Sequence, residues 1–574
     1  MQWILVVTND VLGQPQATEE TVRDMVSKFA RDEVITFTLQ LLGALNVDKD
    51  ANYQTVNRRF VQWAGAPAAA ALAAAQLANP DREWILIESW QQLLLLRSCV
   101  QYCPEAASVG LDTPEGKTLF VKLCIAINDL SIPRGVPTNG DVIADALKAA
   151  AVISPRLWLD NPPNINNSIA RMISFLKEIP VAFPIVRPHA QTLLDRFEQS
   201  LGVSFEDALD FTAFLGYWTK AHRPDQVLDD PTAGVVNPNA WLAETNFNPD
   251  SWTTYCERTT QPLERISDPT PGAGLRWVDP LRFRDRPLIR FPNDLLFISM
   301  PDLLMEKVSF DMFWWLTGGP GGAPQRNAWQ AAFGKITETY VLSILSAISD
   351  NAGGNFRGNV AWDEGEIDGL YWVDNRLAVI EVSGSFVNNS DKMSGDWERL
   401  RKGLTTAFVE RTTARGVDRE AVAQLARDIT WLLERRRNNV EFGVPVRQME
   451  TIHPVIVAPD RLVRTHGVWA FLNDELRSRL PDAMPWQVAP LAVLALEEVE
   501  EIEELARRGH ERFLTSGLPH LMQILRLWEF DSHRYPTFWQ FLADQFANDY
   551  GNQRLRAISD ARLARARLRF RRRE

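Results

Sequence analysis

The stretch Gly365-Glu366-Ile367-Asp368, followed after a short gap by Ile380-Glu381-Val382-Ser383, decides the fold of this chain. Apolar residues on either side of Asp374-Asn375-Arg376 predict two strands joined by a tight turn. The second strand ends abruptly on Glu381, and a carboxylate buried there without a partner would be costly. A hard cation bridging Asp368 and Glu381 would supply that partner, because Mg²⁺ binds one or two carboxylates together with water and phosphate oxygens. We therefore predict a Mg²⁺ or Mn²⁺ site in this hairpin.

This pattern resembles the PD-(D/E)XK nuclease superfamily. That family has a restriction-endonuclease-like core, with an Asp on one strand of a hairpin and Glu-x-Lys on the next. Here Asp368 matches the Asp, and Glu381-Val382-Ser383 matches Glu-x-Lys with Ser in place of Lys. In the family the Lys orients or activates the attacking water and stabilises negative charge in the transition state. The hydroxyl of Ser383 carries no charge, so Lys335 and Lys392 are candidates for a relocated Lys.

Three further segments extend the resemblance along the chain. Phe333–Val341 is similar to the first core helix of the family, in which Glu338 would lie near the metal. Val417–Leu425 is similar to the next helix, in which Gln424 would face the site. Ile452–Pro459 is similar to the core strand that follows. The order of these elements around the hairpin agrees with the order in the family.

The resemblance implies a Mg²⁺-dependent nuclease that cuts DNA. Asp368, Glu381 and the main-chain carbonyl of Val382 would hold the metal, and Glu338 would hold the attacking water or a second ion. Large proteins with such a core often belong to bacterial anti-phage or restriction systems, which would add protein partners. The absence of a Lys at Ser383 keeps two other interpretations open. One is a pseudonuclease that binds nucleic acid or protein without cutting, and the other is a scaffold subunit.

Length and local composition predict a multidomain α/β protein. At 574 residues the chain is too long for one ordinary hydrophobic core. We expect a mostly helical region at 1–222 and a loop-rich connector with short strands at 223–322, within which Arg286–Ser299 reads as a hairpin. The resemblance implies that a nuclease-like domain with a mixed sheet flanked by helices, and with further C-terminal helices, follows at 323–550, and an Arg-rich tail comes last at 551–574.

Charge and composition narrow the functional class. A net charge of −12 argues against broad, nonspecific coating of nucleic acid, although it allows a locally basic groove. The spacing of the four Cys favours reduced core thiols over a metal cluster. The first residues lack a basic leader and no apolar run approaches the length of a bilayer span. We therefore expect a cytoplasmic protein without a membrane segment.

Three other stretches, rich in Arg, in Glu and in Gly, have a biased composition that bears on their structure and contacts. Gly551–Glu574 holds nine Arg, which fits a solubilising disordered tail, contacts with phosphates, or docking on an acidic protein surface. The Glu-rich run Leu496–Leu505 keeps apolar residues at helical spacing, which predicts a solvated acidic face. Gly318–Gly322 predicts a hinge and not a phosphate loop, because no Lys-Ser or Lys-Thr follows and Pro cannot donate an N–H.

Overall fold

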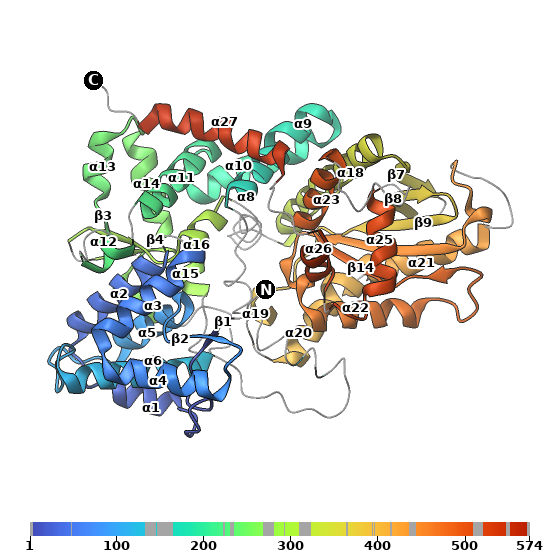
Figure 1. Cartoon of the computed structure of the whole chain (residues 1–574). Helices are drawn as coiled ribbons and strands as arrows, with labels where there is room; N and C mark the ends of the chain where they lie inside the picture. The colour runs from blue at the N-terminus through green and yellow to red at the C-terminus, as the bar shows by residue number, and fades with distance from the viewer. Residues whose placement is uncertain are drawn as a thin grey trace. The chain divides into compact units, whose positions relative to one another are not determined.

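The structure is a computed structural model of the chain, drawn in Figure 1. It describes residues 4–46, 49–131, 145, 148, 165–221, 224–229, 235–267, 281–291, 293–308, 323–362, 365–392, 394, 396–413, 416–435, 443–508, 520–535, 537–546 and 552–570. The predicted hinge at Gly318–Gly322 lies outside these residues.

The chain packs into two compact units that interleave along the sequence. Unit 1 comprises Met1–Gly135, Leu201–Asp311 and Arg562–Glu574, and unit 2 comprises Val136–Ser200 and Met312–Ala561. None of the four predicted segments coincides with one of these units. Both units contain helices and strands, so the predicted α/β class with more than one domain holds at this coarse level.

Unit 1 is mainly helical where it is described, as predicted for the N-terminal region. Helix α1 (Glu19–Val26) begins after Thr18, whose hydroxyl accepts the Thr21 N–H and completes a capping box. Helix α5 (Ser89–Tyr102) is buried on nearly all sides, which fits its run of Leu. The other helices of this unit are α2 (Arg31–Asn46), α3 (Lys49–Ala64), α4 (Ala66–Ala78), α6 (Pro114–Ser131), α11 (Phe205–Ala221), α12 (Pro224–Asp229), α13 (Pro238–Glu244), α14 (Pro249–Thr259), η4 (Leu263–Ser267), α15 (Leu281–Asp285) and α16 (Pro301–Glu306).

Two small sheets accompany the helices of unit 1. Strands β5 (Leu288–Arg290) and β6 (Leu296–Ile298) pair antiparallel, which confirms the hairpin predicted in the connector. They form the centre of a four-stranded sheet with the order β3-β6-β5-β4, in which β3 is Val235–Val236 and β4 is Thr260–Pro262. A second sheet pairs β1 (Ile4–Val6) in parallel with β2 (Glu83–Ile85).

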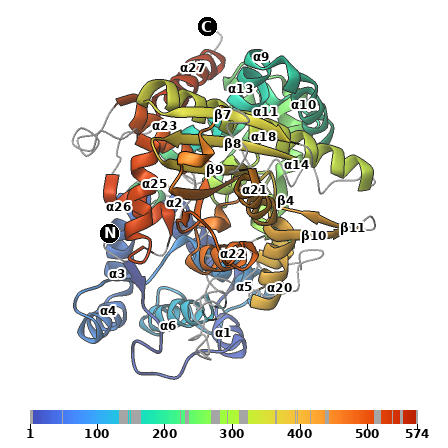
Figure 2. The ribbon, with the colours of Figure 1, turned by 90° about the vertical axis from the view of Figure 1, so that its right-hand side faces the viewer.

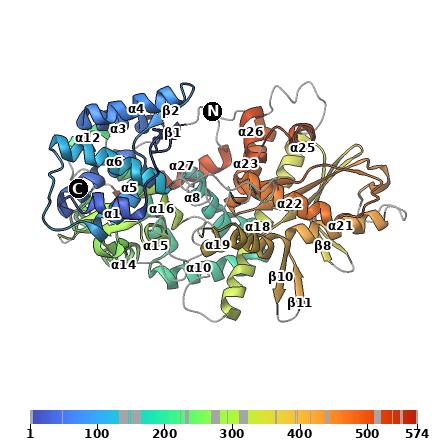
Figure 3. The same cartoon turned by 90° about the horizontal axis from the view of Figure 1, so that it is seen from below.

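Unit 2 is built on a six-stranded mixed sheet with the order β13-β12-β9-β8-β7, in which β14 also pairs with β12. Strands β7 (Asn355–Trp362), β8 (Gly365–Val373) and β9 (Arg376–Val382) form an antiparallel meander, visible in Figure 2. Strand β9 then pairs in parallel with β12 (Thr451–Ala458), which pairs in parallel with β13 (Gln487–Val488) and β14 (Ala492–Ala495). A separate hairpin of β10 (Glu410–Thr413) and β11 (Gly416–Arg419) is seen in Figure 3.

Two groups of helices in unit 2 pack against this sheet. Helices α20, α21 and α22 contribute buried side chains to one apolar core that includes Leu370, Val379 and Ile456 of the sheet. Helix α18 contacts β7, β8 and β9, and it also packs against α23. The bounds of the helices are α8 (Ile165–Ile173), η1 (Ser174–Glu178), α9 (Ile179–Ala182), η2 (Pro184–Val186), α10 (Arg187–Leu201), α18 (Ala323–Ala352), α19 (Asn389–Lys392), α20 (Trp397–Leu404), η5 (Thr405–Val409), α21 (Ala421–Arg435), η6 (Val446–Gln448), η7 (Arg461–Arg464), α22 (His466–Arg479), α23 (Leu496–Arg508), α25 (His520–Asp531), α26 (Phe538–Phe546) and α27 (Gln553–Phe570).

Burial explains the apolar character of the central strands. Every residue of β12 is buried, as is typical of a strand in the middle of a parallel array with both faces covered. The edge strand β7 instead alternates between exposed and covered residues. The predicted strand at Ile452–Pro459 is therefore confirmed as β12, and the predicted first core helix lies within α18. The predicted helix at Val417–Leu425 is correct only from Ala421, because the residues before it pair in the β10–β11 hairpin.

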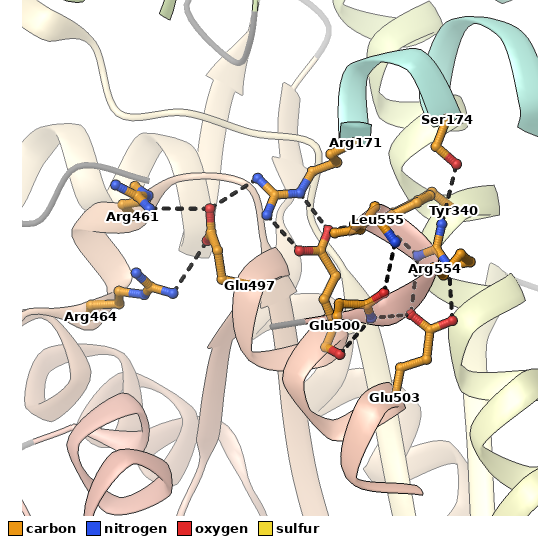
Figure 4. A network of polar contacts seen from close by, with 11 residues as sticks. Arg171, Ser174, Tyr340, Arg461, Arg464, Glu497, Glu500, Glu503, Arg554 and Leu555 are labelled. Atoms are coloured by element: carbon orange, nitrogen blue, oxygen red, sulfur yellow. Dashed lines mark hydrogen bonds and ion pairs between the residues drawn. The ribbon is translucent and has the colours of Figure 1, made fainter. Parts of the chain in front are cut away.

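The prediction that the Glu-rich run is a solvated face is wrong. Glu498, Glu500 and Glu504 of α23 are buried. Figure 4 shows the reason, since arginines from other elements reach the carboxylates of this helix. The guanidinium of Arg171, itself fully buried, donates to Glu500 through Nε at 2.5 Å and through Nη2 at 2.6 Å. The spacing of residues in the sequence does not show which basic residues from distant segments contact this Glu-rich run. The run is therefore predicted to be solvated when only the sequence is known.

The Arg-rich tail forms helix α27 over the residues described, which rules out the first of its three interpretations, a disordered tail, for those residues. Arg554 donates to both carboxylate oxygens of Glu503, at 2.9 and 3.1 Å. Arg562 is buried and pairs with Glu206 and, at 2.5 Å, with Asp210. These two arginines are therefore committed to carboxylates of the same chain and not to phosphates. Among the helices that the structure describes, none combines the length and apolar character needed to cross a bilayer.

Candidate functional site

The predicted hairpin places Asp368 and Glu381 on neighbouring strands, as expected. The antiparallel pairs of β8 and β9 run from Val373↔Arg376 to Gly369↔Ile380, one position before the two acids. There the main-chain ladder stops, and the Val382 N–H donates instead to Oδ2 of Asp368 at 2.7 Å. A side-chain carboxylate thus replaces the main-chain acceptor that an uninterrupted strand would offer. The hairpin opens where its two acids lie.

Glu381 is the most unusual acid of this site. It is only 6% exposed. Within the part of the chain that the structure describes, no group donates a hydrogen bond to its carboxylate. Burial therefore raises the pKa of Glu381 well above its usual value, and the negative charges of Asp368 and Asp428 raise it further, while Arg427 opposes them. A carboxylate with so little compensation needs either a proton or a cation.

Asp368 is perturbed in the same direction. Burial raises its pKa to about 7, although the hydrogen bond from the Val382 N–H opposes that rise. The charges of Glu338, Glu366 and Asp428 contribute to this rise in the pKa of Asp368. Perturbed acids that share a cluster are a frequent mark of functional sites, although structural networks also produce them.

A Lys from helix α18 lies at the edge of this acidic cluster. The Nζ atom of Lys335 donates to Oε1 of Glu338 at 2.5 Å. Partial burial lowers the pKa of Lys335, but Glu338, Glu366 and Asp368 outweigh it and hold that pKa above its ordinary value. Of the two candidates for a relocated Lys, Lys335 is thus within electrostatic reach of the acids.

The second candidate, Lys392, has a structural partner. Its Nζ atom lies 2.7 Å from Oδ2 of Asp460, and both side chains are buried. Asp460 also accepts the N–H of Val387 at 2.8 Å. This ion pair fastens the segment after β9 to the end of β12. The structure thus gives Lys392 a partner other than Asp368 and Glu381, and the interpretation of Lys392 as the relocated Lys stays a prediction.

Ser383 and Gln424 have less distinctive surroundings than the acids. Ser383 is buried, its N–H donates to the Val457 carbonyl at 2.8 Å, and its Oγ accepts the Ser385 N–H at 3.2 Å. Its hydroxyl thus stabilises the turn that follows β9. Gln424 is half-buried on α21, one turn before Asp428, and the described contacts do not join its side chain to Asp368.

Two site residues that sequence reasoning missed come from helix α21. Arg427 donates to Oδ1 of Asp428 through Nε at 3.0 Å and Nη2 at 2.8 Å, and its guanidinium lies 5.1 Å from the ring of Trp362. Gly365 leaves room for this guanidinium, because a Cβ there would lie 2.8 Å from Arg427 Nη2. Asp428 is fully buried in the apolar stripe of α21. The sequence did contain a signal for Asp428, because this acid occupies a position on the apolar face of an amphipathic helix.

The candidate ligands for a divalent cation at this site are the carboxylates of Asp368 and Glu381. Glu381 brings a buried carboxylate to which no described residue donates a hydrogen bond, and Asp368 lies on the adjacent strand beside it. Among the described residues, no three His, Cys, Asp or Glu are gathered closely enough to hold a metal. Two carboxylates suit Mg²⁺, which keeps several waters and takes phosphate oxygens in protein sites. The third predicted ligand, the carbonyl of Val382, remains a prediction.

Models of known protein families, curated proteins and solved structures were compared with this chain, and none matches it. Any function assigned to the protein must therefore come from the chemistry of the site.

Proposed function

We propose that unit 2 carries a Mg²⁺- or Mn²⁺-dependent nuclease site that cuts DNA. The observation that supports it most is Glu381, which is buried next to Asp368 where the β8–β9 hairpin opens and receives no hydrogen bond from any residue that the structure describes. The order of α18, the β7–β9 meander, α21 and β12 is consistent with the restriction-endonuclease-like fold that the sequence pattern implies. A role in a bacterial anti-phage or restriction system stays a prediction.

Each residue would have a defined task in this reaction. Asp368 and Glu381 would hold the cation, and Glu338 would orient the attacking water. The bound ion would polarise the phosphate and lower the pKa of that water. Lys335 would supply the positive charge that the family's Lys provides and Ser383 lacks. The hydrogen bond between Lys335 and Glu338 keeps this ammonium at the edge of the acidic cluster.

Cleavage assays on the full chain test the proposal. Purified protein with Mg²⁺ or Mn²⁺ is expected to cut single- or double-stranded DNA, and Asp368→Ala and Glu381→Ala should reduce cleavage to background because the cation loses a ligand. Asp374→Asn is the matched control, since Asp374 lies in the turn of the same hairpin. Cleavage that survives in both site variants, or that falls equally in the control, would contradict the proposal.

The role of Lys335 can be tested separately. Removing one electrostatic donor from a preorganised site typically costs on the order of 10²–10³ in rate. We therefore expect Lys335→Ala to slow cleavage by about that factor and Lys335→Arg to retain part of the rate. Lys402→Ala, on α20, is the control. If Lys335→Ala cleaves DNA as fast as the parent, a group other than Lys335 stabilises the negative charge of the transition state.

A catalytically degenerate protein is the second candidate. It is favoured by Ser383, whose uncharged hydroxyl is engaged by the Ser385 N–H. On this interpretation the chain binds DNA or a protein partner without cutting. Binding of DNA that Asp368→Ala leaves unchanged, together with no cleavage of DNA under any metal condition, would favour this candidate over the nuclease.

A further inference from the structure

Asn359 lies opposite Asp368 at the point where strand β7 separates from β8. The pairs Gly358↔Gly369 and Val360↔Ile367 bracket this position, and the ladder skips the pair between them. Asn359 has a φ of 52°, in the left-handed region that few residues other than Gly adopt without cost. Asn is among the side chains that tolerate this region best. The sheet is therefore interrupted on both sides of Asp368, once at β7 and once at β9.

The amide of Asn359 joins two acids of the site. In the orientation that satisfies its hydrogen bonds, the amide nitrogen donates to Oε1 of Glu366 at 3.0 Å and to Oε1 of Glu338 at 2.9 Å. These carboxylates come from different elements, β8 and α18, and each raises the pKa of Asp368. Like charges repel, so a neutral group with two N–H bonds is well suited to hold them side by side.

We propose that Asn359 is a positioning residue of the candidate site, which holds Glu338 and Glu366 beside Asp368 and thereby sets the affinity of the site for a divalent cation. This inference rests on the proposed function. The left-handed backbone explains why a strand residue aims its amide at α18. Two carboxylates fixed near Asp368 concentrate negative charge where the cation would bind.

Direct titration with Mn²⁺ alone tests the inference independently of activity. Partners that orient metal ligands typically contribute 10–100-fold in metal affinity. We expect Asn359→Gly to weaken Mn²⁺ binding by about that factor in calorimetry. Gly fits the positive φ, so the thermal midpoint should stay close to that of the parent. A purely structural role would give the opposite pattern, with a lower midpoint and unchanged Mn²⁺ affinity. Asn355→Gly, at an exposed Asn of the same strand, is the control.

A double-mutant cycle checks whether Asn359 acts through Glu338. In a Glu338→Gln background, Asn359→Gly should change Mn²⁺ affinity much less than in the parent, because the two effects share one contact. Equal Mn²⁺ affinity of Asn359→Gly and the parent, or an undiminished effect in the Glu338→Gln background, would overturn the inference. A parent protein that neither binds Mn²⁺ nor cuts DNA would instead reject the proposed function and the inference with it.

Discussion

Replacing Arg171 by Met is expected to lower the free energy of unfolding of unit 2 by about 3–5 kcal/mol, the usual cost of removing one partner from a buried ion pair. Arg171 is fully buried and contacts Glu497 at 3.0 Å in addition to Glu500. Tyr340 also donates to Glu500, at 2.7 Å, so the carboxylate would keep one neutral donor after the substitution. Met fills a similar volume, which limits the contribution of a cavity to the loss.

Denaturant unfolding followed by Trp fluorescence measures this effect. Arg401→Met is the matched control, because Arg401 and its partner Glu398 are both more than half exposed and such pairs contribute little. Adding Glu500→Gln to Arg171→Met should recover part of the loss, since the uncompensated charge is then removed. A change below about 1 kcal/mol in Arg171→Met would show that solvent or other arginines satisfy these glutamates.

Glu497 contributes a pH dependence of defined sign to this network. Although burial raises the pKa of Glu497, Arg171, Arg461 and Arg464 outweigh it and hold that pKa well below its usual value. A carboxyl with a lowered pKa in the folded state stabilises the fold above its unfolded pKa, and this contribution is lost as the pH falls towards the folded value. The stability that Glu497 gives to helix α23 should therefore be lost in acid, whereas Glu498 and Glu501 of the same helix have raised pKa values and act in the opposite direction.

The hairpin and its two acids could be predicted because their signal is local. An apolar run that ends on Glu381, a turn at Asp374 and a second acid at Asp368 are all visible within a few residues. The same holds for β12, whose residues are apolar except for Thr451 and His453 because both faces of the strand are covered. Such features depend on the spacing of apolar residues and on the length of the segment, and both can be read from the sequence.

The surroundings of those acids could not be predicted, because they come together only through the sheet and its helices. Asp428 and Arg427 reach the site from α21, and Arg171 meets Glu500 across 329 positions of sequence. Pairing of a charge with a distant opposite charge has no periodicity. The Glu run of α23 therefore looks like a solvated face, although its partners bury it.

Asp368→Asn is expected to stabilise the protein above neutral pH while it removes the response to Mg²⁺. Asn retains an oxygen that can accept the Val382 N–H, so the hairpin contact is kept. The pKa of Asp368 rises from 3.8 to about 7 on folding. As the pH increases, the unfolded chain therefore ionises first, and the folded state loses relative stability until the pH passes the folded value. This difference between the folded and unfolded pKa values lowers the free energy of unfolding of the parent by about 4 kcal/mol at pH 8. Asn carries no charge at any of these pH values, so the variant does not lose this stability.

Thermal unfolding from pH 5 to pH 8, without and with Mg²⁺, tests both halves of this expectation. The midpoint of Asp368→Asn should exceed that of the parent by an amount that grows with pH. Mg²⁺ at about 100 times its Kd should then stabilise the parent by about 2.7 kcal/mol at pH 8 and leave the variant nearly unchanged. Asp374→Asn, in the turn of the same hairpin, should follow the parent under every condition. If the pH-dependent difference appears without any response of the parent to Mg²⁺, the acids form a proton-holding cluster and the metal site is excluded. If Mg²⁺ stabilises both proteins equally, it binds elsewhere, because a ligand stabilises only the state that holds its site.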